Sequence, residues 1–197
     1  LELVRQLASC YSSMKVHDKA AKELEAILSE GDDPSSRGTR LMYVRELRMS
    51  GDLDNLKKAR EVLNGVLGTA GKPGWGATDL TALIEQGYLL QAEEKWAEAF
   101  GLWSRLVKQL AQRVAQGGVM RDRYFEVYAQ MLGAACKIAA SKRGQAERDA
   151  AYRAAAQQLI NLEKSWPDLG GEQAKARFME LLAKEPDLKE KVDALKK

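Results

Sequence analysis

Small residues recur at matched positions in two parts of this chain, and this feature most constrains its fold. Ala8 and Ala20 have the same separation as Gly87 and Ala99. Larger side chains keep identical intervals around both pairs, and all but one of them are apolar. They are Val4, Leu7, Tyr11, Leu24 and Ile27, and again Leu83, the polar Gln86, Leu90, Trp103 and Leu106. Small side chains allow two helix axes to approach to roughly 8–10 Å. We therefore predict closely packed antiparallel helical pairs, with the large residues filling the space between neighbouring pairs.

One helical stretch combines the largest and the smallest side chains. Trp96 and Trp103 stand there beside Ala97, Ala99 and Gly101. Exposed tryptophans can stack on the bases of single-stranded nucleic acid, but at helical spacing beside alanines they are more typical of a core. We predict that the small residues mark helix crossings and that both tryptophans are core residues.

The rest of the chain also predicts helix. Glycine and proline separate segments whose apolar residues recur at helical spacing, with little alternation of the kind that strands require. Short turns between helices favour antiparallel neighbours. We therefore predict an all-α fold, in one domain over 1–197. Its helical pairs are expected at about 1–30, 39–68, 79–116 and 120–166, with C-terminal capping helices at 172–197.

The spacing resembles the tetratricopeptide repeat. That family places a leucine, a small residue and an aromatic residue on the first helix of each pair, and an alanine and an aromatic residue on the second. The resemblance covers roughly the first 110 residues of the chain. In that family the pattern repeats about every 34 residues. Gln86 replaces an aliphatic residue, Glu94 replaces a glycine, and the second pair has extra residues before Ala59. The resemblance implies a right-handed α-α superhelix, a TPR-like solenoid, whose first helices line a concave groove.

Composition narrows the class of partner. The 31 basic and 28 acidic residues give a net charge of +3 and are mixed along the chain, which is typical of a solvated helical surface and disfavours nucleic acid as a ligand. Cys10 and Cys136 are isolated among apolar neighbours, so we expect buried free thiols, with a disulfide between them as the open alternative. No apolar run reaches the roughly 18 residues of a membrane span. We expect a soluble piece of a longer protein, because the sequence opens inside a predicted helix, and no targeting segment is visible.

Three features suggest chemistry, but none has the required pattern. His17 is the only histidine and has neither a nucleophile nor a second metal ligand at useful spacing. Glu93 and Glu94 are adjacent and would project about 100° apart on a helix, so they cannot converge on one substrate. The glycine-rich segment 68–76 lacks the spacing of a phosphate-binding loop and reads as a linker, with Trp75 packed on nearby helices. We predict no catalytic residue, no cofactor and no metal.

The groove that the resemblance implies gives the candidate site. The predicted first helices carry eight residues on faces that packing does not use: Arg5, Ser9, Ser12, Arg45, Arg48, Ile84, Tyr88 and Gln91. Arginine forks bind carboxylates, and an aromatic side chain such as that of Tyr88 is a low-entropy anchor. This set suits an extended acidic or C-terminal peptide. The competing interpretation is an ordinary solvated helix surface.

These observations favour a non-enzymatic protein-protein interaction scaffold that binds an extended peptide or partner segment in the groove. Two alternatives remain open at this point: a helical repeat that binds nucleic acid through its arginines, and an accessory domain of a larger enzyme or assembly. A homodimer through exposed repeat ends is a further expectation about partners.

Overall fold

The computed structural model describes residues 2–29, 36–69 and 72–197. These residues form ten α-helices, one short 3-10 helix and a two-stranded ladder with two residues in each strand. The all-α prediction is confirmed at this level, whereas the right-handed superhelix and the single domain stay predictions. The chain divides into two compact units, Leu1–Glu94 and Lys95–Lys197. The predicted pair 79–116 is divided between them.

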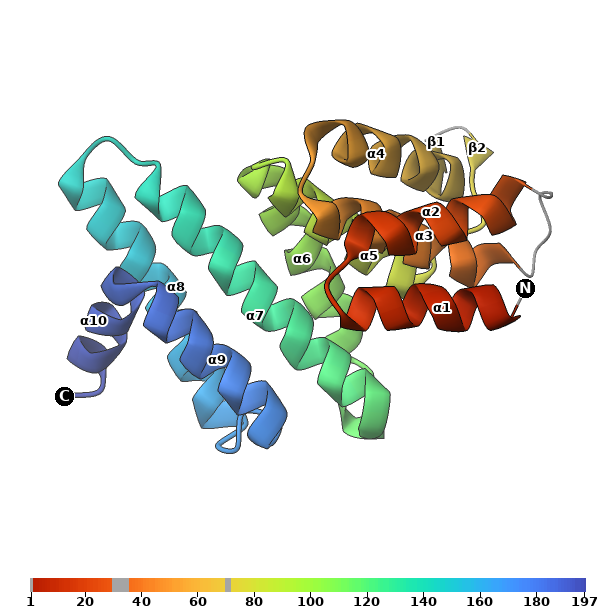
Figure 1. Cartoon of the computed structure of the whole chain (residues 1–197). Helices are drawn as coiled ribbons and strands as arrows, with labels where there is room; N and C mark the ends of the chain where they lie inside the picture. Colours follow the sequence, from red (N-terminus) through yellow and green to blue (C-terminus); the bar gives the residue numbers. More distant parts are fainter. Residues whose placement is uncertain (1, 30–35, 70–71) are drawn as a thin grey trace. The chain divides into compact units, whose positions relative to one another are not determined.

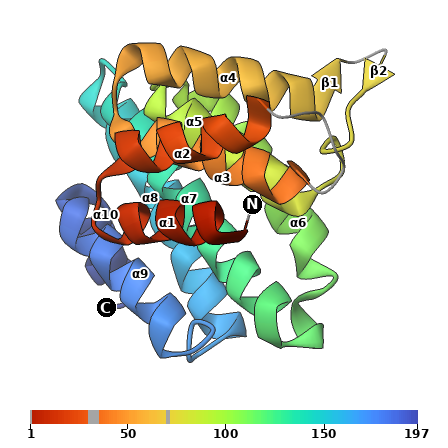
Figure 2. The same ribbon diagram turned by 45° about the vertical axis from the view of Figure 1, so that its right-hand side comes forward.

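The first unit holds five helices. They are α1 (Glu2–Ser13), α2 (His17–Ser29), α3 (Arg37–Ser50), α4 (Leu53–Leu67) and α5 (Leu80–Ala92). Helices α1 and α2 run side by side across a short turn (Figures 1 and 2). Hydrogen bonds join α1 to α3 and α3 to α5, so these three first helices form one row. Helices α2 and α4 form the other, joined by an ion pair between Glu25 and Lys58.

Aspartates begin two of these helices. The side chain of Asp52 accepts a hydrogen bond from the Asn55 backbone N–H at 3.3 Å, and that of Asp79 accepts one from Ala82 at 3.0 Å. Each satisfies a backbone donor that has no partner inside the helix. Asp79 is thus the N-cap of α5. Asp18 lies inside the first turn of α2, because that helix begins at His17.

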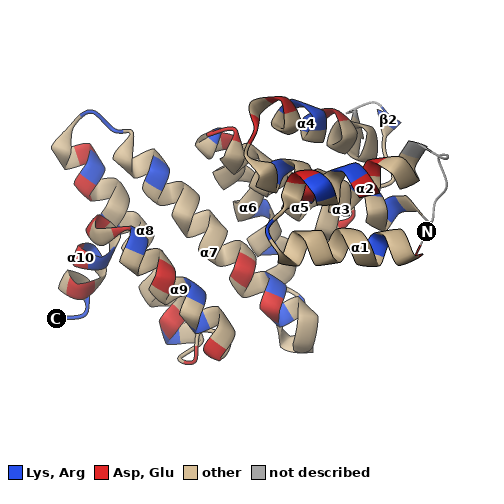
Figure 3. Ribbon diagram, viewed as in Figure 1, with Lys and Arg blue, Asp and Glu red and all other residues tan. Residues whose placement is uncertain are grey.

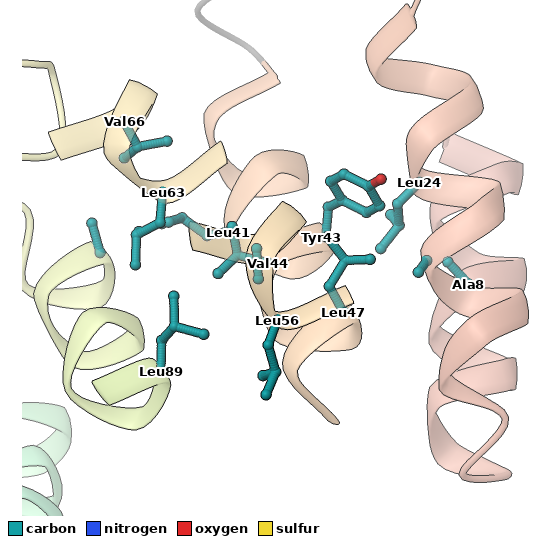
Figure 4. Packing of buried hydrophobic residues seen from close by; sticks show 13 residues of the cluster. Ala8, Leu24, Leu41, Tyr43, Val44, Leu47, Leu56, Leu63, Val66 and Leu89 are labelled. Atoms are coloured by element: carbon teal, nitrogen blue, oxygen red, sulfur yellow. The ribbon is translucent and has the colours of Figure 1, made fainter. Parts of the chain in front are cut away.

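The core of the first unit contains the small residues that the sequence singled out. Ala8, Ala20, Ala59 and Gly87 are all buried. Ala8 and Leu24 of the first pair face Tyr43 and Leu47 of α3 (Figure 4). The burial of these small residues and the packing of Leu24 against α3 agree with the prediction, whereas the placement of small residues at crossings within a pair stays a prediction.

The described parts of the glycine-rich segment after α4, residues 68–69 and 72–76, are held by backbone hydrogen bonds. Strands β1 (Gly68–Thr69) and β2 (Lys72–Pro73) pair there, and the N–H of Gly76 donates to the carbonyl of Val66. A Cβ on Gly68 would lie 2.1 Å from a backbone nitrogen, so only glycine fits. Trp75 packs against the helical core, as predicted, and Arg37 lies 5.2 Å from its ring centroid.

The second unit also holds five helices, and the first three of them are longer than any described helix of the first unit. They are α6 (Trp96–Ala111), α7 (Gly118–Ala140), α8 (Gln145–Ser165), α9 (Glu172–Lys184) and α10 (Pro186–Leu195), with the 3-10 helix at Val114–Gln116. Helix α7 contacts α6, α8 and α9, and α10 contacts α8 and α9. The pair predicted at about 120–166 corresponds to α7 and α8, and α9 begins where the capping segment was predicted to begin. The pair predicted at 79–116 contains a break, because α6 ends at Ala111 and a 3-10 turn follows before Gly117.

The tryptophan-bearing helix α6 is only partly as predicted. Trp103 and Ala99 are buried, whereas Trp96 is partly exposed. Ala97 and Gly101 face solvent, and a Cβ added to Gly101 would meet nothing within 4 Å. Only Ala99 therefore serves the close packing that was predicted for all three small residues. The other two lie on the opposite side of the helix.

An aromatic cluster fixes the connection between α8 and α9. The rings of Phe125 and Trp166 meet edge to face with centroids 5.8 Å apart, and Arg121 lies over the Trp166 ring. Gly170 has a φ of +89°, and a Cβ there would come within 2.2 Å of the Phe125 ring. This position therefore requires glycine both for its backbone conformation and for space.

Candidate functional site

The first-helix row of the first unit is held together by buried polar contacts. The guanidinium Nε of Arg5 donates to the hydroxyl of Thr39 at 2.9 Å. The hydroxyl of Ser12 donates to one carboxylate oxygen of Glu46 at 2.8 Å, and His17 Nδ1 lies 2.7 Å from the other. Glu46 is buried, so these contacts replace the water that its carboxylate loses. Helix α1 is thereby fixed in register against α3.

A second polar contact joins α3 to α5. Arg48 donates through Nε and Nη2 to one oxygen of Glu85, at 3.3 and 3.1 Å. Its guanidinium also lies 4.9 Å from the ring centroid of Tyr88. Both charged side chains are mostly buried, so the pair holds α5 beside α3 in the way that Glu46 holds α1.

Between its contacts with α1 and its contacts with α5, helix α3 has one exposed face. Met42, Arg45 and Met49 are exposed and fall within about 60° of one another at 100° per residue. We call these three residues the α3 strip. Thr39 and Glu46, which contact α1, flank it on one side, and Arg48 flanks it on the other. The side chain of Arg45 has no hydrogen bond or ion pair with any described residue, so its guanidinium is available to a ligand.

The structure separates the eight predicted groove residues into three groups. Ser9 and Arg45 are exposed, and Gln91 is partly buried. Four residues take part in contacts between first helices, namely Arg5, Ser12, Arg48 and Tyr88. Ile84 is buried, so the expectation that packing does not use its face is wrong. It lies in α5 among residues that face the core.

The prediction omitted the two methionines of the α3 strip. Met42 and Met49 lie three residues before and four residues after Arg45, which is the spacing of one helix face. That spacing was a signal available in the sequence. Methionine side chains are flexible and polarizable, and they suit surfaces that adapt to a partner. The strip therefore combines one cationic group with two adaptable apolar ones.

The perturbed pKa values lie away from the strip. A hydrogen bond to Glu25 raises the pKa of Lys58, which belongs to the row of second helices. In the second unit, burial raises the pKa of Cys136 to about 12, so its thiol is inert at neutral pH. Nδ1 of His17, the only histidine in the sequence, is already in hydrogen-bond contact with the carboxylate of Glu46. The strip thus offers binding groups rather than an acid–base pair.

Within the described part of the chain, no three or more histidine, cysteine, aspartate or glutamate side chains are grouped so that they could hold a metal ion. Across the same residues, no helix has the length and apolar character needed to cross a membrane. No protein-family model matches the sequence, and no curated protein and no solved structure matches it either.

Proposed function

We propose that the chain is a non-enzymatic protein-interaction scaffold that binds an extended segment of a partner protein across the first helices of its first unit. The α3 strip carries this proposal, because it is an open face bounded on both sides by helices fixed in place. Ser9 of α1 and Tyr88 and Gln91 of α5 extend the surface beyond the strip. A rigid surface loses little conformational entropy on binding, which favours affinity.

The residues of the strip define the chemistry of the ligand. Arg45 supplies a planar set of donors that suits a carboxylate, and each methionine beside it suits an apolar side chain. The first unit as a whole has 12 basic and 15 acidic residues, so a polyacidic ligand would be repelled. We therefore infer a segment with a single acidic residue between apolar residues.

We further propose that the first unit is a divergent tetratricopeptide-like array. Two features support this. The hydrogen bonds between α1 and α3 join residues 34 positions apart, and those between α3 and α5 join residues 37 positions apart. These separations are close to the repeat period of about 34 residues. The buried small residues Ala8 and Gly87 also occupy equivalent places in α1 and α5.

The proposal is tested by peptide binding. A panel of fluorescent peptides would carry a glutamate between two leucines, the same peptide with glutamine or lysine in place of glutamate, and a polyglutamate peptide. Fluorescence anisotropy should show binding of the first peptide alone. Substitution R45E should reduce its affinity at least tenfold, because the variant places two carboxylates together.

The matched control is R105E, which changes an exposed arginine on α6 in the second unit. It alters net charge by the same amount, so it separates a local contact from a general electrostatic effect. Equal affinity of wild type, R45E and R105E would contradict the proposal, as would equal binding of the glutamate and lysine peptides.

A further inference from the structure

We propose that the α3 strip is also a site of reversible oxidation, at which a hydroperoxide converts the thioethers of Met42 and Met49 into sulfoxides and thereby weakens peptide binding. This inference rests on the function proposed above, because it assigns a regulation to the same surface. Met42 is 36% exposed and Met49 is 46% exposed, so a small oxidant can reach both side chains. Of the six methionines, only these two lie on the proposed binding surface.

The modification is a two-electron oxidation of sulfur. The sulfur attacks the terminal oxygen of the hydroperoxide, so that an S–O bond forms and the O–O bond breaks. The proton of the attacked O–H group moves to the leaving oxygen, which departs as an alcohol, or as water when the oxidant is hydrogen peroxide. Reductases that use thiols reverse the change: two thiols become a disulfide, and the sulfoxide oxygen leaves as water.

Sulfoxides at these two positions act against the ligand in two ways. Each sulfoxide oxygen is a hydrogen-bond acceptor, and an apolar side chain that covers it removes its water without a replacement. Arg45 lies three residues after Met42 and four residues before Met49, which is the spacing of neighbours on one helix face. Its guanidinium, which is free of contacts with described residues, can donate to either sulfoxide oxygen. The oxidised strip therefore occupies the cation that the ligand carboxylate requires.

Arg48 distinguishes Met49 from the other exposed methionines. Nη1 of Arg48 donates a hydrogen bond to the Met49 sulfur at 3.5 Å, while its Nε and Nη2 donate to Glu85. The guanidinium is thus fixed beside the sulfur. A thioether sulfur has two lone pairs, and the Arg48 N–H lies at one of them. The oxidant therefore forms the S–O bond through the other lone pair, and one of the two sulfoxide epimers predominates at Met49.

Two methionines away from the strip serve as internal controls. Met14 is 70% exposed and Met179 is 58% exposed, and no described residue donates a hydrogen bond to either sulfur. Met14 follows α1, which is almost entirely tan in Figure 3, whereas Met179 lies on α9, which carries many charged residues. They therefore oxidise in contrasting surroundings, and both epimers should form at each. Because each methionine sulfoxide reductase acts on one epimer, Met49 should need only one of the two enzymes for full reversal.

Hydrogen peroxide treatment followed by fluorescence anisotropy tests the regulation. The treated wild type should bind the peptide that carries a glutamate between two leucines at least tenfold more weakly, and both reductases together should restore binding. M42L combined with M49L keeps apolar side chains and should bind equally well before and after treatment. Cys10, which is exposed rather than buried as its neighbours predicted, is present in both proteins and so controls for thiol oxidation.

Chromatography of the oxidised fragments tests the role of Arg48. One sulfoxide epimer should exceed the other at least threefold at Met49, whereas the two should be nearly equal at Met14 and Met179. R48L combined with E85L removes the donor together with its buried partner, and should bring the ratio at Met49 close to one. A merely structural role of Arg48 would leave this ratio unchanged.

The outcomes separate the two proposals. An untreated wild type that does not bind the peptide would overturn the proposed function and the regulation with it. Binding that survives complete oxidation of Met42 and Met49, or that peroxide also abolishes in the double leucine variant, would overturn the regulation alone. Equal epimers at Met49 in the wild type would overturn the assignment of Arg48.

Discussion

The two units of this chain hold their helices together in different ways. In the first, polar side chains that are buried between first helices connect one helix to the next, with Glu46 and Glu85 as acceptors. In the second, the buried residues of the contacting helices α7 and α8 are mostly small or apolar, such as Ala134, Cys136 and Ala155, beside one hydrogen bond from the Tyr128 hydroxyl to the Gln158 carbonyl. Its ion pairs involve at least one partly exposed side chain, as between Lys137 and Glu185.

The buried polar contacts fix how neighbouring helices align, whereas the apolar contacts fill the core. A buried carboxylate is costly unless its partner stands in one place, so Glu46 and Glu85 define how the first helices align. Apolar contacts contribute more stabilisation for each area buried but tolerate small shifts. The first unit therefore holds the open α3 strip in a defined position, while the buried residues of α7 and α8 in the second unit are mostly apolar.

The largest expected effect concerns Arg48. Substitution R48E leaves the Glu85 carboxylate buried beside a second negative charge, so we expect the first unit to lose roughly 3–5 kcal/mol of stability. R45E, one helical turn away and exposed, should change stability by less than about 0.5 kcal/mol. Urea unfolding followed by circular dichroism measures both. Similar midpoints for the two variants would contradict the structural role of Arg48.

In the same urea experiment a double variant should restore the stability that R48E loses. Combining R48M with E85L removes both charges and keeps apolar volume, so most of the lost stability should return. A double variant no more stable than R48E would indicate that Tyr88, rather than Glu85, is the important contact of Arg48.

In the second unit, G170A should be the most damaging small change. Its Cβ would meet the buried ring of Phe125 in a backbone conformation that disfavours side chains. Overpacking and the left-handed backbone together should cost roughly 2–4 kcal/mol. Tryptophan fluorescence of Trp166, which touches the same ring, should shift at a lower urea concentration. If G170A unfolds thermally at the same temperature as the wild type, the prediction is wrong and the connection after α8 adapts to the new side chain.

Alkaline pH should distinguish the units. Burial raises the pKa of Cys136 from its ordinary 9.0 to about 12, so the folded second unit keeps this proton while the unfolded chain releases it. Its stability should therefore fall between about pH 9 and pH 12, by about 1.4 kcal/mol per pH unit at most from this group. In a W75F background the remaining tryptophans all belong to the second unit and report its unfolding.

C136A serves as the control for that titration. It removes the ionisable group, so the fall in stability with pH should become shallower, whatever its effect at pH 7. The raised pKa values of Tyr128 and Tyr152, both about 12 and both caused mainly by burial, should leave part of the dependence in place. An unchanged slope in C136A would contradict the burial of its thiol.

The smallest expected effect is a gain. G101A adds a methyl group to the exposed side of α6, where nothing lies within 4 Å. Alanine loses less conformational entropy than glycine on entering a helix, so the second unit should gain about 0.5–1 kcal/mol. Chemical denaturation of wild type and variant measures the difference. Destabilisation would mean that α6 packs through this face, as the sequence first indicated.

The sequence predicted features that depend on neighbouring residues and missed those that depend on residues far apart in the chain. Helix positions depend on periodicity and nearby breakers, and α9 begins at Glu172, where the capping segment was predicted to begin. The small residues at Ala8 and Gly87 were identified because a whole pair repeats. The role of Arg48 was missed, because its partner Glu85 is 37 residues away and no local pattern links them.

The candidate site was predictable only in outline. Arg45 was identified from its helix face, and its exposure is confirmed. Ile84 was placed on the same kind of surface, but the faces of α5 could not be assigned from an almost uniformly apolar helix. The residue type of Trp96 likewise predicts a core position, yet the side chain is partly exposed in the structure.

Methyl NMR of the six methionines tests the central claim most directly. With methyl-labelled methionine, titration of the peptide that carries a glutamate between two leucines should shift the signals of Met42 and Met49. The signals of Met14, in the turn after α1, and of buried Met131 should stay in place. Shifts confined to other methionines, or none while the peptide binds, would contradict the assignment of the α3 strip as the binding surface.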